Sequence, residues 1–389
     1  MNGWGEQQGL GLYLHVPFCL KKCSYCDFYS LPVRPGNLQR YVRAVMKELA
    51  LRAWDIEDRR IRTVFLGGGT PSLLSASDLT SIMNSISFNL ELDNKAEISL
   101  EANPTSLDGN ALQSLQKAGF NRISLGVQSF QDQDLQILGR SHNSQQARQS
   151  IELIKNSGFS NFNLDLIYGI PGQTIGMWKE TLAQALELEP AHLSVYLLQL
   201  DEETPLSRDI KDGLCQLSDE DTEADMYQAA IQLIEKAGLV QYELSNFARP
   251  GYECQHNLGY WKAMEYVGIG PGAVSFQANR RYLNKRNLLQ YLTCLENDQE
   301  PELEELECME AQELVADAMV LGLRLCAGIN LERFTQSYGI NVLDYYKDII
   351  EEYMNRDLLE VDNGYLRLSK KAYFICNQVI CHFLPDLKS

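Results

Sequence analysis

The sequence predicts an α/β fold in which strands and helices alternate to form an incomplete barrel, followed by a small α+β domain. Three observations lead to this prediction. Short apolar runs recur along the chain, segments with apolar residues at helical spacing lie between them, and the composition changes after Cys294. Strands that alternate with helices build a parallel sheet, because each helix returns the chain to the same end of the sheet.

Six apolar runs are the predicted strands of the barrel, which we place within residues 1–240. They are Leu12–Val16, Thr63–Leu66, Ile98–Leu100, Ile123–Val127, Phe162–Ile167 and Leu193–Leu197. Intervening segments such as Leu38–Ala53 and Ser144–Asn156 carry apolar residues at helical spacing, and several end near a glycine. Six such units predict a partial (β/α)6 barrel of the TIM type, whose reactive groups gather at the C-terminal ends of the strands.

The remainder of the chain divides into an extension, residues 241–300, and a C-terminal domain, residues 301–389. An acidic stretch, Glu296–Glu310, marks the change. The predicted helices of this domain are Gln312–Cys326, Leu331–Tyr338 and Val342–Asn355, and the predicted hairpin is Leu358–Val361 with Tyr365–Leu368 around Asp362-Asn363-Gly364. Three helices and a hairpin predict a winged-helix-like α+β domain.

Charge and composition argue against several functional classes. The formal net charge is -18, from 52 acidic and 34 basic residues, with no long Lys/Arg run. A broad electrostatic contact with nucleic acid is therefore not expected, and a DNA-reading role for the winged-helix-like domain is disfavoured. The ten cysteines show no regular disulfide framework, and Met1–Gly9 lacks the features of a targeting segment. We expect a cytoplasmic protein without a transmembrane segment.

Three cysteines after the first predicted strand carry the clearest chemical signal. Cys19, Cys23 and Cys26 have the spacing C-x3-C-x2-C. Three thiolates can bind three irons of a [4Fe-4S] cluster, which leaves the fourth iron open to the amino and carboxylate groups of S-adenosylmethionine (SAM). The alternatives are a zinc site completed by His15 and three thiols that merely lie close in sequence. The spacing favours the cluster.

Polar and glycine residues follow the next predicted strands. The turn Gly67-Gly68-Gly69-Thr70-Pro71 lets the backbone approach a ligand because glycine has no Cβ, although an ordinary strand-to-helix turn is the alternative. Glu101, Gln128 and Asp165 lie at or near three further strand ends, where they suit ribose hydroxyls, while each alone could be a structural loop anchor. Arg140 can pair with a ligand carboxylate, or it is a solvated helix end.

The segment Cys254–Trp261 combines a thiol, the imidazole of His256 and two aromatic rings within eight residues. These groups could hold and flank a heme. Taken alone, the histidine fits an ordinary loop residue better, because histidine serves many roles. The following turn, Gly268-Ile269-Gly270-Pro271-Gly272, lacks the full dinucleotide-binding fingerprint, and we interpret it as a tight turn near the site.

Three longer stretches resemble the oxygen-independent coproporphyrinogen III oxidase family. They are Arg122–Phe130, Asp165–Thr174 and Tyr242–Ala248, and the resemblance extends over nearly the whole chain. It implies a radical SAM barrel in which Cys19, Cys23 and Cys26 bind the cluster. It also implies the SAM contacts, which are Tyr13, Gly68, Gly69, Thr70, Glu101, Gln128, Arg140 and Asp165.

Within that family, the chain is more similar to the heme chaperones than to the oxidases. Phe28 stands two residues after Cys26, where the oxidases typically have a further cysteine. Residues 256–261 match the H-N-x-x-Y-W motif of the chaperones, and this match implies that His256 is a heme ligand. The segment before Tyr13 is also shorter than the N-terminal segment of the oxidases.

The sequence therefore predicts a heme chaperone that binds a [4Fe-4S] cluster, SAM and heme. The expected partners are an electron donor for the cluster and acceptor hemoproteins such as respiratory enzymes. Delivery of heme to these acceptors could involve a transient contact with the membrane. No coproporphyrinogen oxidase activity is expected. The alternative is the oxidase itself, in which a radical derived from SAM abstracts hydrogen from propionate side chains and carbon dioxide leaves twice.

Overall fold

The computed structural model describes residues 9–56 and 59–385. The expectation that Met1–Gly9 contains no targeting segment concerns residues 1–8, which lie outside the described part. The centre of the molecule is a 12-stranded sheet with the order β14-β13-β12-β11-β1-β4-β5-β6-β7-β8-β10-β9. This order places the predicted barrel strands side by side in the middle of the sheet.

All six predicted barrel strands are confirmed, and they pair in parallel in the order of the sequence. They are β1 (Leu10–Val16), β4 (Ile61–Gly68), β5 (Leu92–Ala102), β6 (Arg122–Gln128), β7 (Phe162–Tyr168) and β8 (His192–Leu197). The loop between β1 and the first helix carries two short strands, β2 (Phe18–Cys19) and β3 (Leu31–Pro32).

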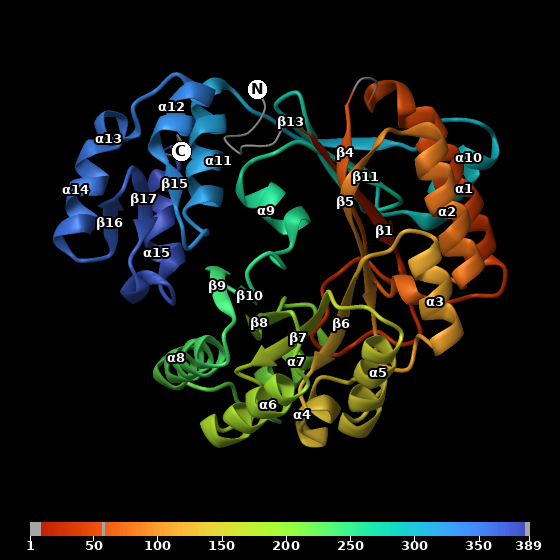
Figure 1. Cartoon of the computed structure of the whole chain (residues 1–389), viewed down its shortest axis with the longest axis horizontal. Helices are drawn as coiled ribbons and strands as arrows, with labels where there is room; N and C mark the ends of the chain where they lie inside the picture. The colour runs from red at the N-terminus through yellow and green to blue at the C-terminus, as the bar shows by residue number, and fades with distance from the viewer. Residues whose placement is uncertain (1–8, 57–58, 386–389) are drawn as a thin grey trace.

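Helices follow the barrel strands and cover the outer face of the curved sheet (Figure 1). They are α1 (Asn37–Arg52), α2 (Ala76–Asn89), α3 (Gly109–Lys117), α4 (Asp132–Ile137), α5 (Ser144–Asn156), α6 (Ile175–Glu187), α7 (Pro205–Lys211) and α8 (Glu220–Lys236). Side-chain caps explain several starting points. Asn143 forms a capping box with Gln146 at the start of α5, and the Thr174 side chain accepts from the Met177 N–H at the start of α6.

Strands outside the barrel extend its sheet at both edges, and they come from the predicted extension and, in β14, from the start of the predicted C-terminal domain. β9 (Val240–Glu243) and β10 (Asn246–Ala248) continue it beyond β8, while β11 (Tyr266–Ile269), β12 (Val274–Gln277), β13 (Arg280–Asn284) and β14 (Leu303–Cys308) continue it beyond β1. Two helices accompany them, α9 (Gln255–Trp261) and α10 (Leu288–Glu296). Within the described residues the end strands β14 and β9 do not pair, so the barrel is incomplete. The domain boundaries at 240 and 300 stay predictions.

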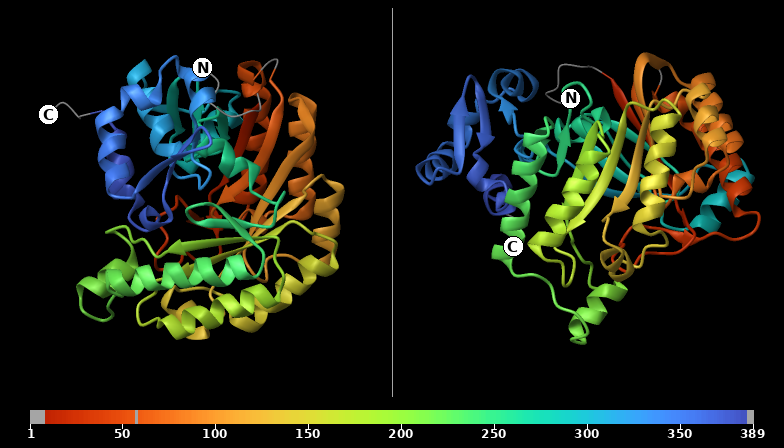
Figure 2. Two further views of the ribbon diagram at one scale, coloured as in Figure 1. Left: turned by 60° about the vertical axis from the view of Figure 1, so that its left-hand side comes forward. Right: turned by 60° about the horizontal axis from the view of Figure 1, so that its bottom comes forward.

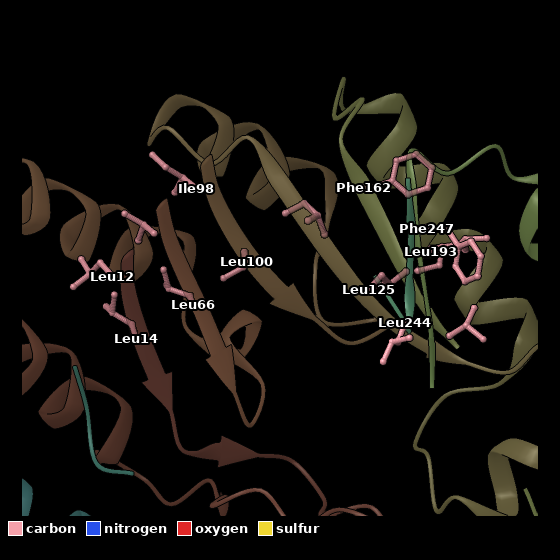
Figure 3. Close-up of a cluster of buried hydrophobic side chains, with 14 of the residues drawn as sticks. Leu12, Leu14, Leu66, Ile98, Leu100, Leu125, Phe162, Leu193, Leu244 and Phe247 are labelled. Carbon is pink, nitrogen blue, oxygen red and sulfur yellow. The ribbon is translucent and has the colours of Figure 1, made fainter. Parts of the chain in front are cut away.

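Side chains of the parallel strands alternate between two chemically different faces. Leucine, isoleucine and phenylalanine side chains such as Leu14, Leu66, Leu100 and Leu125 are buried on the outer face (Figure 3). The residues between them line a polar lumen, among them Glu101, Arg122, Ser124, Asn163, Asp165 and Ser194. Neighbouring residues of a strand point to opposite faces, so burial of one face under the helices directs the polar groups inward.

The C-terminal domain contains the predicted hairpin and helices, except that the predicted helix Val342–Asn355 is divided into two helices at Tyr346. Its elements are α11 (Ala311–Gly322), β15 (Ile329–Asn330), α12 (Leu331–Tyr338), α13 (Val342–Tyr345), α14 (Lys347–Asn355), β16 (Leu359–Asp362), β17 (Tyr365–Leu368) and α15 (Cys376–Ile380). Asn363 and Gly364 have φ of 48° and 80°, as the predicted two-residue hairpin turn requires. No helix among the described residues is long and apolar enough to span a membrane.

The C-terminal domain packs on the side of the sheet that the outer helices leave open (Figures 1 and 2). Lys370 forms an ion pair with Glu235 of α8 at 2.9 Å, and Glu243 at the end of β9 forms a β-bridge with Leu325. Helix α9 lies between the sheet and α11. The domain therefore forms one wall of the space at the open side of the barrel.

Glu48 on α1 fastens the extension to the barrel. Its buried carboxylate accepts hydrogen bonds from the Gly270 N–H at 2.8 Å, the Asn284 Nδ2 at 2.7 Å and the Tyr291 hydroxyl at 2.6 Å. Arg52, one helical turn further along, lies 3.7 Å from the same carboxylate. Burial raises the pKa of Glu48, with Arg52 and these hydrogen bonds opposing the shift. The turn at Gly270 is thus held by a helix more than two hundred residues earlier.

Replacing Glu48 by alanine should lower the thermal midpoint of unfolding, because the substitution leaves three buried donors and Arg52 without their partner. Breaking a buried charged network from one side costs about 3–5 kcal/mol. Calorimetry of Glu48→Ala beside Glu152→Ala, an exposed position on α5, measures the effect. The control should remain close to the wild type, and an equally small change in both variants would contradict the assignment.

Candidate functional site

A cavity of about 720 Å³ opens where the C-terminal ends of the parallel strands meet the C-terminal domain. Ten of the twelve predicted site residues line it, namely Cys19, Cys23, Cys26, Gly68, Gly69, Thr70, Glu101, Gln128, Arg140 and Asp165. The other two, Tyr13 and His256, line the polar lumen below it. A further cavity, of about 680 Å³, lies at the opposite ends of β1, β4 and β5 and holds none of the cysteines.

The three cysteines are half-buried and share this cavity. The Thr70 hydroxyl lies 3.6 Å from the Cys19 sulfur as a donor, and the Arg140 guanidinium donates to the Cys23 sulfur at 3.3 Å. Desolvation raises the pKa of Cys26, and the nearby thiols of Cys23 and Cys19 raise it further. The three neighbouring cysteines would repel one another as thiolates, and two of their sulfurs have a hydrogen-bond donor beside them. This arrangement fits a bound group that supplies positive charge to all three sulfurs.

His15 does not complete a zinc site in this structure. Its Nδ1 bonds to the Tyr13 hydroxyl at 3.1 Å, and its Nε2 faces the Tyr29 carbonyl at 2.8 Å. Across the described residues, no three His, Cys, Asp or Glu side chains are gathered around one point that a single metal ion would occupy. Thiolates that each bind a different iron need no such gathering.

Asn103, which the sequence did not single out, joins the cysteine loop to the strand ends. Its Nδ2 donates to the Thr70 hydroxyl at 2.9 Å, and its Oδ1 accepts from Arg140 at 2.5 Å. Arg140 also donates to the Gly126 carbonyl at 2.7 Å. The guanidinium is thereby held between Cys23, Asn103 and Gly126. Asn103 directly follows the end of β5, so the rule that strand ends carry the reactive groups could have found it.

Gly68 and Gly69 are required by protein packing. Gly68 has φ of 108°, and its N–H donates to Glu101 Oε2 at 3.1 Å. A Cβ added to Gly68 would lie 2.6 Å from the His15 ring, and one added to Gly69 would lie 2.5 Å from the Phe18 carbonyl oxygen. The space that a Cβ would take is therefore filled by the protein itself, which accounts for both glycines without a ligand, and an approach of their backbone to a ligand stays a prediction.

Glu101 and Asp165 line the cavity from β5 and β7. Glu101 is the last residue but one of β5, whereas Asp165 lies in the middle of β7, which corrects its predicted place at the strand end. Desolvation, reinforced by the charge of Asp165, raises the pKa of Glu101 to about 8. Desolvation also raises the pKa of Asp165, which accepts from the Asn163 amide at 2.7 Å and from the Ser124 hydroxyl at 3.2 Å. Two carboxyl groups on the strands that flank β6 present oxygen acceptors that fit the hydroxyl donors of a ribose.

Gln128 closes β6 in an unusual backbone conformation. Its φ is 69°, and the pairing of β6 with β7 is irregular at this point. The residue is buried, with 9% of its surface exposed. A left-handed backbone is costly for a residue other than glycine and is often found at functional positions. The side chain lines the cavity beside the cysteine loop.

Helix α9 carries the H-N-x-x-Y-W motif into the lumen of the barrel. His256 is 3% exposed, with Nδ1 bonded to the Thr63 hydroxyl at 2.7 Å and Nε2 to the Tyr260 hydroxyl at 2.9 Å. Its ring stacks on Phe65 with centroids 5.1 Å apart. Burial, followed by the charge of Arg122, lowers the pKa of His256 to about 3, so the imidazole is neutral. Binding of heme iron would require one hydrogen bond to open, and this role stays a prediction.

Glu243, at the end of β9, also borders the cavity. It is 1% exposed and accepts a short hydrogen bond from the Asn246 amide. Burial raises its pKa to about 7, while hydrogen bonds and the charge of Arg324 partly oppose the shift. The native protein therefore favours the protonated form, whose stabilising effect is complete below the ordinary carboxyl pKa and is lost as the pH rises through 7.

Glu243→Gln should weaken the dependence of stability on pH. The wild-type thermal midpoint should fall between pH 5 and pH 8, and the fall should be smaller in Glu243→Gln because the substitution removes a titration worth about 1–3 kcal/mol. Glu152→Gln, at an exposed position, should retain the wild-type dependence. Parallel curves for the wild type and Glu243→Gln would rule out this assignment.

Comparison with known proteins agrees with this geometry. Residues 13–185 match the profile of the Radical SAM superfamily, and residues 309–375 match the profile of the HemN C-terminal domain. The solved structure of coproporphyrinogen III oxidase (HemN) from Escherichia coli, a radical SAM enzyme, is similar with a TM-score of 0.85. The match covers 98% of this chain and 91% of that chain at 24% identity, so it shows the fold.

Curated relatives show the family. The heme chaperone HemW of Lactococcus lactis subsp. lactis (strain IL1403) is 36% identical over 374 residues, which cover 96% of this chain and 97% of that protein. The heme chaperone HemW of Escherichia coli (strain K12) is 41% identical over 267 residues, which cover 68% of this chain and 69% of that protein. With one relative matched over almost the full length of both proteins, the chain belongs to the family of the heme chaperone HemW within the radical SAM superfamily.

Proposed function

We propose that this protein is a heme chaperone that binds a [4Fe-4S] cluster, SAM and heme, and passes the heme to acceptor hemoproteins such as respiratory enzymes. One observation carries the proposal. A single cavity joins three thiols, the polar strand ends of a radical SAM barrel and an aromatic wall from α9 and the C-terminal domain. The heme chaperones that this chain resembles support the same function.

The proposed cluster ligands are Cys19, Cys23 and Cys26. When bound, a cluster held by three thiolates supplies an open iron for the amino and carboxylate groups of SAM and an electron received from a donor protein. The chain contributes a loop whose orientation is set by the hydrogen bonds from Thr70 and Arg140 to the sulfurs. Such contacts to thiolate sulfurs tune a cluster and hold its ligands in place.

The proposed SAM contacts share the cavity with these thiols, except for one. Glu101 and Asp165 offer acceptors for the ribose hydroxyls, and Gln128 and Arg140 line the same cavity, with Arg140 in contact with Cys23 of the cysteine loop. The backbone of Gly68, Gly69 and Thr70 lines the side next to Cys19. The exception is Tyr13, whose hydroxyl lies in the lumen against His15 and would reach SAM only through the floor of the cavity.

We place heme against the wall formed by α8, α9 and the C-terminal domain. Trp261, Tyr227, Tyr373 and Phe374 line this part of the cavity and offer flat or apolar surface to a macrocycle. On the other side lies the cysteine loop, where Phe28 is 61% exposed. Phe28 occupies the position at which the oxidases typically have a further cysteine, so the chaperone role is favoured over the oxidase.

Anaerobic reconstitution tests the main proposal in one preparation. We expect about four irons per chain, as one [4Fe-4S] cluster requires, and a saturable shift of the Soret band on titration with heme. Cys23→Ser should lose the iron, because one of three ligands is removed, while Cys381→Ser, at an exposed cysteine, should keep it. The loaded protein should transfer heme to an apo-form of a respiratory hemoprotein. Turnover of coproporphyrinogen III without saturable heme binding would instead establish the oxidase.

His256 and Tyr260 together test the heme ligand. If His256 binds the iron, His256→Ala should weaken heme binding by about tenfold or more. Tyr260→Phe should strengthen it by about fivefold, because the substitution frees Nε2 from a hydrogen bond worth about 1 kcal/mol.

His382→Ala, at an exposed histidine of the C-terminal domain, is the matched control and should bind heme as the wild type does. The dissociation constant from Soret titration is the readout, with iron content as a check on folding. Wild-type affinity in His256→Ala would remove His256 from the heme site.

A further inference from the structure

Arg324 is a permanently charged side chain in the wall of the cavity that has no acidic partner at contact distance. It follows α11 and lines the cavity beside Trp261. Within the described residues, no carboxylate lies within 4.0 Å of its guanidinium, and its Nε is buried without a hydrogen-bond partner. The charge of Arg324 acts to lower the pKa of Glu243, but the Glu243 carboxylate lies beyond ion-pair distance of the guanidinium. An arginine with five N–H donors in a fixed fork is rarely left in this state.

Trp261 presents a second unused donor in the same wall. The Arg324 guanidinium carbon lies 4.9 Å from the centroid of the Trp261 ring, which is cation–π contact distance. The indole Nε1 is buried and has no acceptor. A buried indole N–H usually finds a partner, because leaving a buried donor unpaired costs about 1–3 kcal/mol. The tryptophan that ends the H-N-x-x-Y-W motif therefore both orients the arginine and adds a donor next to it.

The composition of the chain makes the missing partner informative. The protein carries 52 acidic residues and a net charge of -18. Several other arginines of the fold have close carboxylates, such as Arg281, which pairs with Asp317 at 2.6 Å. A cation and an indole donor that lie side by side in the cavity wall, with no acceptor in contact with the indole N–H or the Arg324 Nε, constitute a site for an anionic group. The planar fork of arginine matches a carboxylate in a two-point contact.

We propose that Arg324, positioned by Trp261, binds a carboxylate of the molecule that occupies the cavity, and that this carboxylate is a heme propionate. The inference rests on the proposed heme chaperone function and adds the anchor for the polar edge of the macrocycle. The carboxylate of SAM has the same chemistry. The position of Arg324 beside the aromatic residues proposed to hold the macrocycle favours heme, and the experiment below separates the two ligands.

Three ligands and three variants form the test, all with the full chain reconstituted anaerobically. The ligands are heme, heme dimethyl ester, in which both propionates lose their charge, and SAM. Arg324→Gln should bind heme about tenfold more weakly than the wild type, the size expected for one charge-assisted carboxylate contact. Heme dimethyl ester should bind the wild type and Arg324→Gln equally. SAM affinity should stay unchanged. Arg249→Gln, at an exposed arginine, should match the wild type with every ligand.

Trp261→Phe keeps the test decisive if Arg324→Gln folds poorly. This substitution retains an aromatic face under the guanidinium but removes the N–H donor, so heme affinity should fall by about two- to fourfold, with the ester unaffected. Unchanged heme affinity in Arg324→Gln, or an equal loss for heme and ester, would overturn the inference while leaving the chaperone function intact. A loss confined to SAM would assign the arginine to SAM instead. A wild type that binds no heme would refute the proposed function itself.

Discussion

Side chains that alternate across the parallel strands determine the chemistry of this molecule. The outer face of β1 and β4–β8 is leucine- and isoleucine-rich and lies under the helices, so the residues in between must point into the lumen. An ordinary parallel barrel fills that space with branched apolar side chains. Here it holds Glu97, Glu101, Arg122 and Asp165, together with serine, asparagine and histidine side chains. The lumen therefore cannot close as a dry core, and a cavity persists at the strand ends.

Buried charge of both signs makes such a lumen tolerable. Arg122 is almost fully buried, and although desolvation acts to lower its pKa, the neighbouring Cys254, Glu97 and Asp165 raise it overall. Desolvation is the main cause that lowers the pKa of His192 and of His256, and the charge of the Arg122 guanidinium lowers both further. Both imidazoles are therefore neutral. Hydrogen bonds of Asn163 to Ser124, Asp165 and His192 tie three strands together across this polar face. The arrangement presents fixed acceptors to a ligand without needing water to stabilise them.

Two structural elements border the open end of this lumen and complete the candidate binding site, the cysteine loop on one side and the wall from α9 and the C-terminal domain on the other. Asn103 and Arg140 connect the cysteine loop to the ends of β5 and β6. Hydrogen bonds to the barrel therefore help to fix where the thiols lie. On the other side, α9 and the C-terminal domain supply aromatic groups and the guanidinium of Arg324, which has no carboxylate within 4.0 Å among the described residues. The proposed ligands thus meet surfaces of different character within one cavity: sulfur and carboxylate groups toward the barrel, aromatic rings and a cation toward the C-terminal domain. A chaperone that holds a flat, dianionic macrocycle next to SAM fits this division.

The sequence by itself determined the six barrel strands, the hairpin at Asn363-Gly364 and the cysteine spacing, because these depend on local periodicity, turn chemistry and short-range order along the chain. It also identified ten residues that line one cavity, since parallel strands end at a common edge. Only the tertiary structure decided which contacts these residues make. The edge strands β9 to β14 are short and join strands distant in sequence. Thr63 meets His256 across 193 positions, and Arg324 meets Trp261 through the packing of two segments. Such contacts form only when segments distant in sequence pack together, so local sequence propensity cannot predict them.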